Sequence, residues 1–496
     1  MRKPWLYEER LKNPNMGKIV YQVIVDRFVP SLNLEGKKDL YGYPRSLKSW
    51  DTLPKGGHFM PDAKYYSHEL EFYGGDLKSL MKKLDYLKEL DIDMLYLNPI
   101  FDSLSNHKYD ASDYLKISPE YGDMNDLKQL SDSLHNQGQR LILDGVFNHM
   151  GIHSPLFQSA KDETSVYRDW FHFNESYPEG VRLWADASSL PELNLENEQV
   201  KDYIFKKDTS VIRSYLKLGI DGFRLDVAFD IGYDILKELT NHAHEEKATS
   251  LIVGETWNYP KRWLNSMDGV MNFTLREIIF HTVEQRFSPE EVNTLLEKMV
   301  SDCGIDGLLK SWNVLDNHDT VRLNHRLNEQ NQRLAEVMQF TFPGSPNLYY
   351  GSELGMSGAN DPENRAPMRW DLNAIGNERL QWIKKLISVH KQERALIVGD
   401  YLALISSKLV AYERHTDLVE DTTLVILNPT NAEVEDHILV PDSSLMNYSK
   451  FDTILGEVED VSLIAGLLKV KLKPKSFVIL KPKTKPEKSY SPYKRV

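Results

Sequence analysis

Three acidic residues stand at the ends of apolar runs, in a fixed order along the chain. Asp226 follows Gly-Phe-Arg-Leu, Glu255 follows Ile-Val-Gly, and Asp319 follows Leu-Asp-Asn-His. A strand buried on both faces reads as a continuous apolar run, so packing gives no reason for a carboxylate at its end. Three such carboxylates are the groups that cleavage of a sugar acetal requires: an acid, a nucleophile and a charge stabiliser.

These acids need a scaffold that gathers strand ends, and the rest of the chain predicts one. Short apolar runs alternate with helical patterns, and the eight expected strands cover residues 19–25, 93–97, 140–146, 221–227, 250–254, 269–273, 311–316 and 346–350. Right-handed strand–helix–strand connections make such strands parallel. We therefore predict an α/β fold, a (β/α)8 TIM barrel, with its active site at the carboxyl ends of the strands.

Two helices of this barrel are predicted from apolar spacing. Asp76 is suited to cap the first, in which Leu77, Leu80, Leu84 and Leu87 recur at helical intervals. The second is expected to cover residues 197–218, where apolar side chains form one face.

The regular alternation is interrupted twice. Residues 148–196 are rich in aromatic residues, Ser, Asn and Pro without clear periodicity, which predicts an inserted domain B after the third strand. From residue 398 the pattern changes to short alternating runs, including 409–413, 423–427, 433–440 and 468–480, which predict an all-β C-terminal β-sandwich domain over 398–485. The barrel is thus assigned to 1–147 and 197–397, and the Lys- and Pro-rich end, 486–496, to a flexible tail.

Composition excludes several classes of function. The chain has 496 residues and a net charge of −13, which opposes binding to nucleic acid or to an anionic membrane. No run is long and apolar enough to cross a bilayer, and the first residues lack the apolar core of a signal peptide. Cys303 is the single cysteine, so no internal disulfide can form. We expect a cytoplasmic protein, with a removed signal peptide as the alternative.

Five ordered segments carry a resemblance to a known family. They are Leu-Tyr-Leu-Asn-Pro-Ile-Phe at 95–101, Asp-Gly-Val-Phe-Asn-His at 144–149, Gly-Phe-Arg-Leu-Asp-Val-Ala at 222–228, Gly-Glu-Thr-Trp at 254–257 and Asp-Asn-His-Asp at 316–319. In this order and at barrel spacing, they resemble the α-amylase family of retaining glycoside hydrolases (glycoside hydrolase family 13). The resemblance extends over about residues 20–480.

Other segments resemble one branch of that family, which contains cyclomaltodextrinase, neopullulanase and maltogenic amylase. Ser-Asn-His-Lys-Tyr-Asp at 105–110 and Asp-Pro-Glu-Asn-Arg at 361–365 are similar to this branch, as is Leu-Pro-Glu-Leu-Asn at 190–194. In the last, Glu192 replaces the usual Lys. Phe229-Asp230 also replaces the usual Asn-Glu. The first strand is expected near Ile19, so the N-terminal β-domain of the branch is expected to be absent.

The acids are expected to have distinct roles. Asp226 is the expected nucleophile, which forms a covalent glycosyl-enzyme, and Arg224, on the same face of the strand, holds it ionised. Glu255 is the expected general acid/base, because one group has to protonate the leaving oxygen and then activate water. The resemblance implies that Asp319 stabilises the oxocarbenium-like transition state.

The resemblance also implies residues that bind substrate. His149 and His318 match positions that bond sugar hydroxyls, and Tyr109 matches one that stacks on the same sugar. Trp257 and Phe229 are expected on the leaving-group side. The remaining expected site residues are Asn106 and Arg365, which contact substrate, and Asp144, which supports Arg224 and His149.

Taken one at a time, several of these residues have ordinary structural explanations. Arg224 with Asp226 is equally consistent with a structural ion pair, Trp257 with loop packing and Arg365 with a surface salt bridge. Histidine-containing groups at 149–153 and 242–246 have metal-ligand spacing, but one lies in a loop and the other at a helix end. We therefore predict no cofactor and no metal, and leave a structural calcium ion as an open alternative.

The combined prediction is a retaining α-glucan hydrolase. It would cleave α-1,4-glucosidic bonds in short linear or cyclic maltooligosaccharides, with some transglycosylation, because a sugar hydroxyl can replace water as the acceptor. The enzyme alternatives are an α-glucosidase or oligo-1,6-glucosidase and a 4-α-glucanotransferase. The alternative from another class is an inactive carbohydrate-binding or transporter-partner subunit. The expected partner is an α-glucan oligosaccharide, with no nucleic acid and no membrane, and the chain is expected to be a monomer or a homodimer.

Overall fold

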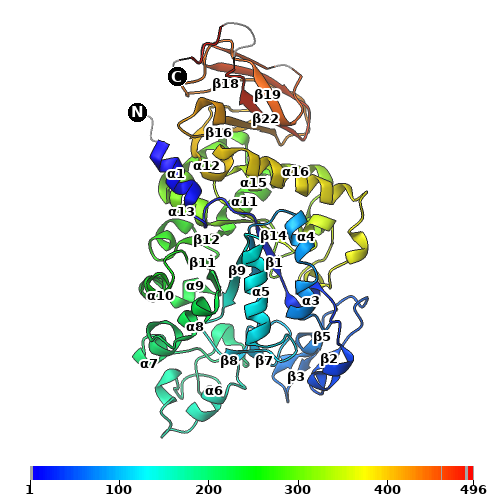
Figure 1. Ribbon diagram of the computed structural model, residues 1–496, viewed down its shortest axis with the longest axis vertical. Helices are drawn as coiled ribbons and strands as arrows, with labels where there is room; N and C mark the ends of the chain where they lie inside the picture. Colours follow the sequence, from blue (N-terminus) through cyan, green and yellow to red (C-terminus); the bar gives the residue numbers. More distant parts are fainter. Residues whose placement is uncertain (1–3, 460, 486–489, 495–496) are drawn as a thin grey trace.

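The computed structural model describes residues 4–459, 461–485 and 490–494, and its centre is a closed barrel of parallel strands (Figure 1). The barrel strands are β1 (Val20–Val23), β6 (Met94–Leu97), β9 (Arg140–Gly145), β10 (Gly222–Leu225), β11 (Leu251–Thr256), β12 (Gly269–Asn272), β13 (Trp312–Val314) and β14 (Ser345–Tyr349). β1 closes the ring by pairing with both β14 and β6. The eight predicted strands and the (β/α)8 barrel are confirmed.

Side chains fill the inside of the barrel. Tyr96 and Trp312 lie there with ring centroids 5.1 Å apart, in a buried cluster that includes Val253 and Met271. Because alternate residues of a strand point to opposite sides, their neighbours on the strands face outward and join the larger cluster beneath the helices. The packed interior supports the strand ends from below.

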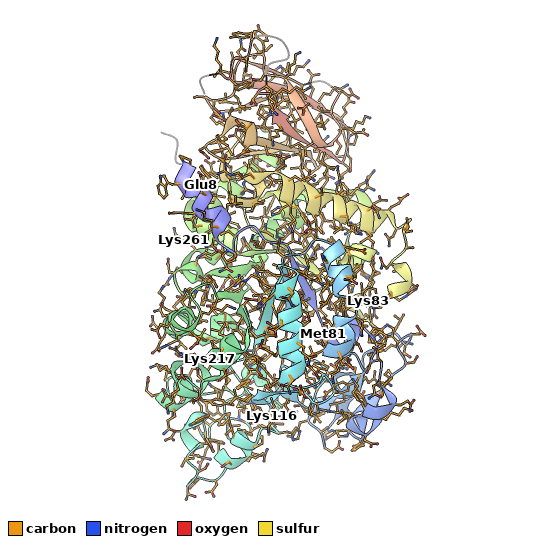
Figure 2. The ribbon with its side chains drawn as sticks, in the orientation of Figure 1. Glu8, Met81, Lys83, Lys116, Lys217 and Lys261 are labelled. Atoms are coloured by element: carbon orange, nitrogen blue, oxygen red, sulfur yellow. The ribbon has the colours of Figure 1, made fainter. Side chains whose placement is uncertain are left out.

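Helices surround the barrel (Figure 1). The main ones are α1 (Pro4–Lys12), α3 (Leu77–Met81), α4 (Leu84–Glu89), α5 (Met124–Asn136), α8 (Val211–Leu218), α10 (Tyr233–Glu246), α11 (Phe273–Val283), α12 (Pro289–Cys303), α13 (Ile305–Lys310), α15 (Glu329–Thr341), α16 (Glu378–Gln392) and α17 (Arg394–Val398). Asp76 caps α3 as predicted, since its side chain accepts the N–H of Ser79 at 2.7 Å. The first predicted helix is divided, however, and Met81 and Lys83 mark the break between α3 and α4 in Figure 2.

The prediction of one continuous helix over 197–218 was wrong. The segment forms α7 (Glu198–Lys201), a π-helical turn (Asp202–Lys206) and then α8. Lys207 and Ser210 have extended backbone between these pieces. The break contains Asp, Thr and Ser in succession, residue types that lower helix propensity because their side chains compete for backbone hydrogen bonds.

Two long segments lie at the end of the barrel where the strands finish, opposite the C-terminal domain (Figure 1). Residues 148–196 contain α6 (Pro155–Ala160) and isolated bridges. Residues 30–75, for which no structure was predicted, contain the short strands β2 (Ser46–Leu47), β3 (Phe59–Met60), β4 (Tyr65–Tyr66) and β5 (Glu71–Phe72). Lys64 Nζ lies 3.2 Å from Glu179 Oε1, and the Tyr65 ring stacks on His153, so the two segments contact each other above the rim.

The end of the chain forms two antiparallel sheets with a shared hydrophobic cluster, which confirms the all-β prediction. One sheet has the order β15 (Asp400–Ala403), β16 (Val410–His415), β17 (Thr423–Asn428), β22 (Ser476–Pro482), β19 (Phe451–Gly456). The other has the order β18 (Val434–Leu439), β21 (Leu467–Leu472), β20 (Val461–Ile464). The run 468–480 is thus divided between β21 and β22, one in each sheet, by a turn in which Lys475 has a φ of 50°.

The predicted flexible tail lies partly outside the described residues, which omit 486–489 and 495–496. Within the described part, Tyr493 is buried in the cluster of the C-terminal domain. Its hydroxyl accepts the backbone N–H of Met446 at 3.3 Å.

Candidate active site

One buried guanidinium gathers three of the predicted carboxylates. Arg224 Nη1 lies 2.9 Å from Asp144 Oδ1 and 2.8 Å from Asp226 Oδ1, and its Nη2 lies 2.9 Å from Glu255 Oε2. Arg224 is the cross-strand neighbour of Asp144 on β9, and Asp226 stands two residues further on, so strand alternation directs all three side chains to one side. Glu255 comes from the end of β11, the next strand of the barrel.

The charges of this cluster do not balance, because one guanidinium faces three carboxylates. Burial raises the pKa of Asp226 well above its ordinary value, Arg224 opposes this, and the charges of Glu255 and Asp144 raise it again. Burial also raises the pKa of Asp144, although Arg224 and Tyr96 counteract it. The cluster as a whole therefore keeps a proton at a pH where separate carboxyl groups have lost theirs.

Glu255 is held by donors on both oxygens. Oε2 accepts the backbone N–H of Val227 at 3.0 Å, and Oε1 accepts the indole N–H of Trp257 at 3.0 Å. Val227 has φ 39° and ψ 47°, a left-handed conformation that is rare and strained for a β-branched residue. Trp257 is 48% exposed and stacks on Phe273, with ring centroids 3.8 Å apart. Trp257 thus contacts the expected acid/base directly.

His149 lies on the other side of Asp226. Its Nε2 is 4.0 Å from Asp226 Oδ2 and has no hydrogen-bond partner among the described residues, although the side chain is buried. Burial lowers the pKa of His149 to about 3, so the imidazole is neutral. A neutral ring with a free nitrogen beside the nucleophile fits a sugar hydroxyl.

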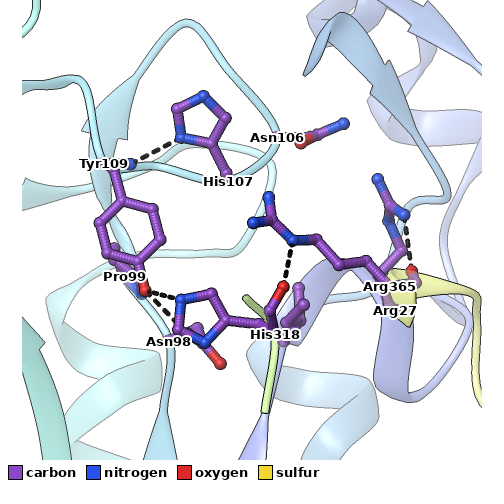
Figure 3. A pocket seen from close by; sticks show the side chains of 9 residues that line it. Arg27, Asn98, Pro99, Asn106, His107, Tyr109, His318 and Arg365 are labelled. Atoms are coloured by element: carbon purple, nitrogen blue, oxygen red, sulfur yellow. Dashed lines mark hydrogen bonds between the residues drawn. The ribbon is translucent and has the colours of Figure 1, made fainter. Parts of the chain in front are cut away.

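Tyr109 and His318 form one unit with nearly parallel rings. Their ring planes differ by 10°, and the hydroxyl of Tyr109 lies 2.5 Å from His318 Nε2 (Figure 3). Gln22 Nε2 lies 2.9 Å from His318 Nδ1, and since an amide N–H donates, Nδ1 is the acceptor and Nε2 carries the hydrogen. Tyr109 in turn donates to Asp144 Oδ2 at 3.0 Å, which connects this unit to the Arg224 cluster.

Asp319 lies beyond this unit, next to Arg365. Arg365 Nη2 is 3.3 Å from Asp319 Oδ1, and its Nε donates to the carbonyl of His318 at 2.9 Å. Asp319 is the most accessible of the three predicted acids, with 32% of its side chain exposed. Arg365 is therefore part of the site wall rather than an isolated surface salt bridge. It lines the pocket in Figure 3 together with Ile24, Arg27, Asn98, Pro99, Asn106, His107, Tyr109 and His318.

Two predicted contact residues have less freedom than the sequence suggested. Asn106 reaches the pocket, but its Nδ2 donates to the carbonyls of His68 and Glu71 and ties down the segment before α3. Phe229, in the short helix α9 (Ala228–Ile231), is half-buried against the main hydrophobic cluster. Asp230 beside it accepts the indole N–H of Trp184 at 2.9 Å.

Sequence reasoning missed Trp184, whose ring stacks on His149 with centroids 5.1 Å apart. Trp184 stands seven residues before Pro191 of the 190–194 motif, and that proximity was the signal available. Gln22, Tyr96 and Asn98 were also missed, because their pattern on a strand or at its end is that of core residues.

The two histidine groups considered as metal ligands have other contacts. Arg213 Nη2 donates to His242 Nδ1 at 2.8 Å, and His153 stacks on Tyr65. Within the described ranges, no three His, Cys, Asp or Glu side chains are arranged to hold a metal ion. No helix among the described residues is long and apolar enough to cross a membrane.

Comparison with known proteins gives a family and a fold. The family model for the α-amylase catalytic domain matches residues 22–394. Neopullulanase 2 of Thermoactinomyces vulgaris is 34% identical over 484 residues, which cover 93% of this chain and 77% of the relative. The intracellular maltogenic amylase of Bacillus subtilis is 33% identical over 392 residues, which cover 77% of this chain and 63% of the relative.

A solved structure adds the fold. The ligand-free cyclic α-maltosyl-(1→6)-maltose hydrolase of Arthrobacter globiformis superposes with a TM-score of 0.77 at 24% identity, over 97% of this chain and all of that one. The match over residues 22–394 includes the three strand-end acids, Arg224 and both site histidines. This chain belongs to the α-amylase family and is a glycoside hydrolase.

Proposed function

We propose that the protein is a retaining α-glucan hydrolase that cleaves α-1,4-glucosidic bonds in short linear or cyclic maltooligosaccharides, with some transglycosylation. The observation that carries this proposal is that Asp226 and Glu255 both form ion pairs with the guanidinium of Arg224. Two neighbouring carboxyl groups on one guanidinium suit the retaining mechanism, in which one attacks the sugar and the other transfers the proton.

The first step requires that the one proton kept by the cluster lies on Glu255 and that Asp226 is ionised. Asp226 then attacks the anomeric carbon while Glu255 gives its proton to the departing glycosidic oxygen. The bond to the leaving sugar breaks, and an ester bond joins the remaining sugar to Asp226. Arg224 orients the attacking carboxylate, and His149 offers its free Nε2 to a hydroxyl of that sugar. Both ring nitrogens of His318 already have protein partners, so His318 can bond a sugar hydroxyl only by sharing the hydrogen on Nε2. Asp319, paired with Arg365, supplies negative charge beside the developing oxocarbenium ion.

In the second step, Glu255 takes a proton from water, whose oxygen attacks the anomeric carbon and displaces Asp226. Each displacement inverts the anomeric carbon, so two displacements keep the α-configuration. A hydroxyl of a second sugar can replace the water and gives transglycosylation. The exposed Trp257, beside the acid/base, is the surface on which an acceptor sugar would stack.

The preference for short substrates rests on the rim. Residues 30–75 and 148–196 contact each other there, through the Lys64–Glu179 ion pair and the stack of Tyr65 on His153, and form a wall beside the site. The names of the neopullulanase and maltogenic amylase relatives agree with a maltooligosaccharide substrate. The name of the intracellular relative also supports a cytoplasmic location.

The test is the product profile of the wild-type protein on cyclodextrin, maltotriose, pullulan and soluble starch. We expect rapid hydrolysis of the short substrates, α-anomeric products and slow turnover of starch. Starch as the best substrate would contradict the oligosaccharide preference. Hydrolysis of α-1,6 bonds only, transfer without hydrolysis, or no turnover would support in turn an oligo-1,6-glucosidase, a glucanotransferase or a binding subunit.

A further inference from the structure

Trp184 connects two parts of the site that come from different segments of the chain. Its ring stacks on His149, with centroids 5.1 Å apart and planes at 23°. Its indole N–H donates to Asp230 Oδ2, on the helix that follows the nucleophile. Trp184 is thus held between the segment that follows β9 and the helix that follows β10.

The backbone after Trp184 is unusual. Ala185 has φ 48° and ψ 32°, and Asp186 has φ 58°, so two successive residues other than glycine adopt left-handed conformations. Such conformations cost about 1–3 kcal/mol each and persist where the surrounding structure requires them. Here the turn places the indole on His149, while Leu183 and Leu190, on either side of the turn, are anchored by the bridge from Leu183 to Pro191 and the bond from Trp184 N–H to the carbonyl of Leu190.

His149 needs such support because its hydrogen bonds hold the ring on one side only. Nε2 has no partner among the described residues, and the rest of the ring has one hydrogen bond to the backbone of Tyr109 and a long contact of 3.5 Å between Nδ1 and Asn148 Nδ2. The titratable groups that act on it are Asp226, Asp110 and His107. A ring held by a single hydrogen bond can still turn about that bond, so its orientation depends on its packing partner.

We propose that Trp184, held in place by Asp230, is a positioning residue that aligns His149 with the sugar attacked by Asp226. This inference rests on the proposed function and adds to it a residue that acts through His149 rather than on the substrate. Loss of the indole would let the imidazole turn and admit water to its face, while the carboxylate cluster around Arg224 would stay in place.

The first test is a double-mutant cycle measured on maltotriose. Trp184→Leu should lower kcat about 10- to 100-fold, because displacement of a group by about 1 Å costs that much. KM should change less, because a contact to the reacting sugar acts chiefly in the transition state. In a His149→Ala background, Trp184→Leu should cost less than about twofold. Trp184→Phe, which keeps a flat ring, should retain most of the activity that each background has with Trp184 present.

The second readout needs no substrate. Trp184→Leu should raise the pKa of His149 from about 3 towards the ordinary histidine range, seen by NMR titration, while Trp184→Phe should leave it low. Asp230→Leu removes the acceptor of the indole N–H while every residue of 148–196 stays the same. It should lower kcat and raise the pKa of His149 less than Trp184→Leu does. It takes the place of Trp184→Leu in the cycle if that variant does not fold.

Equal losses from Trp184→Leu in the wild-type and His149→Ala backgrounds would overturn the proposal, because Trp184 would then act independently of His149. An unchanged His149 titration in Trp184→Leu would do the same. Neither result bears on the proposed function, which hydrolysis by the wild-type protein tests separately. Conversely, a changed titration in a protein without turnover on any α-glucan would support the alignment and reject the proposed function.

Discussion

The strands β9 and β10 carry a charged cluster at each end, and the two clusters have opposite balances. At the carboxyl end, Arg224 faces three carboxylates. At the amino end, Asp221 is surrounded by basic side chains. Its Oδ1 lies 2.7 Å from Lys247 Nζ and 3.5 Å from Arg140 Nε, and its Oδ2 lies 2.8 Å from His135 Nε2. One cluster has too few cations for its carboxylates, and the other has more than enough.

The pKa values follow this difference. Burial favours the neutral form of both Asp226 and Asp221, but only at Asp221 do the cations prevail. Arg140 and the hydrogen bonds from Lys247 and His135 hold the pKa of Asp221 below its ordinary value. The pKa of Asp226 is well above its ordinary value. A satisfied cluster contributes stability, whereas an unsatisfied one holds a proton available for chemistry.

The largest expected effect in this comparison is on turnover. Asp226→Asn should lower kcat by at least about 10 000-fold, because it removes the nucleophile. The melting temperature should equal or exceed that of the wild type. A raised folded-state pKa means that ionisation costs stability as pH rises above the pKa of the unfolded chain, and Asn does not ionise. A calorimetric series from pH 4 to 8 should therefore show the variant gaining relative to the wild type.

The acid/base gives the next effect. Glu255→Gln should impair hydrolysis of maltotriose far more than that of an aryl maltoside with a good leaving group, which needs little protonation. The wild-type kcat/KM profile should lose activity at high pH as the cluster releases its proton, at a pH above the ordinary carboxyl range. Equal losses on both substrates would assign the acid to another residue.

The amino-end cluster should respond in the opposite way. Asp221→Asn should leave kcat per folded molecule unchanged but reduce stability by about 1–2 kcal/mol at neutral pH, because the partly exposed cations lose a buried carboxylate that accepts their hydrogen bonds. The lowered pKa of Asp221 contributes stability that is present above the unfolded pKa and is lost as pH falls through the folded value. The free energies of unfolding of the wild type and the variant, measured by denaturation, should thus become equal in acid. A large fall in kcat would break the distinction between the two ends.

The smallest expected effect lies at the rim. Phe229→Asn should change the ratio of transfer to hydrolysis by about threefold, because an amide offers hydrogen bonds where the ring offers an apolar face. Since Phe229 packs partly on the hydrophobic cluster, a stability loss of about 1 kcal/mol should accompany it. Product analysis on maltotriose and cyclodextrin measures the ratio, and an identical distribution would place Phe229 away from the acceptor.

The sequence predicted the barrel because its strands are buried on both faces and read as apolar runs. It also predicted the meeting of Arg224, Asp226 and Glu255, since strand alternation and rim position decide that contact. The role of Trp184 could not be predicted, because its contact with His149 depends on a left-handed turn at Ala185 that no sequence periodicity indicates. The strands within 30–75 were missed because each has only two residues.

The central claim is that Asp226 attacks the sugar while Glu255 serves as acid/base. Incubation with an activated fluorinated α-glucosyl donor, followed by proteolysis and mass spectrometry, tests it most directly. We predict that the glycosyl group is attached to the peptide that contains Asp226, and that the product of normal turnover has the α-configuration. A label on Glu255 or Asp319, or a product of inverted configuration, would contradict the account.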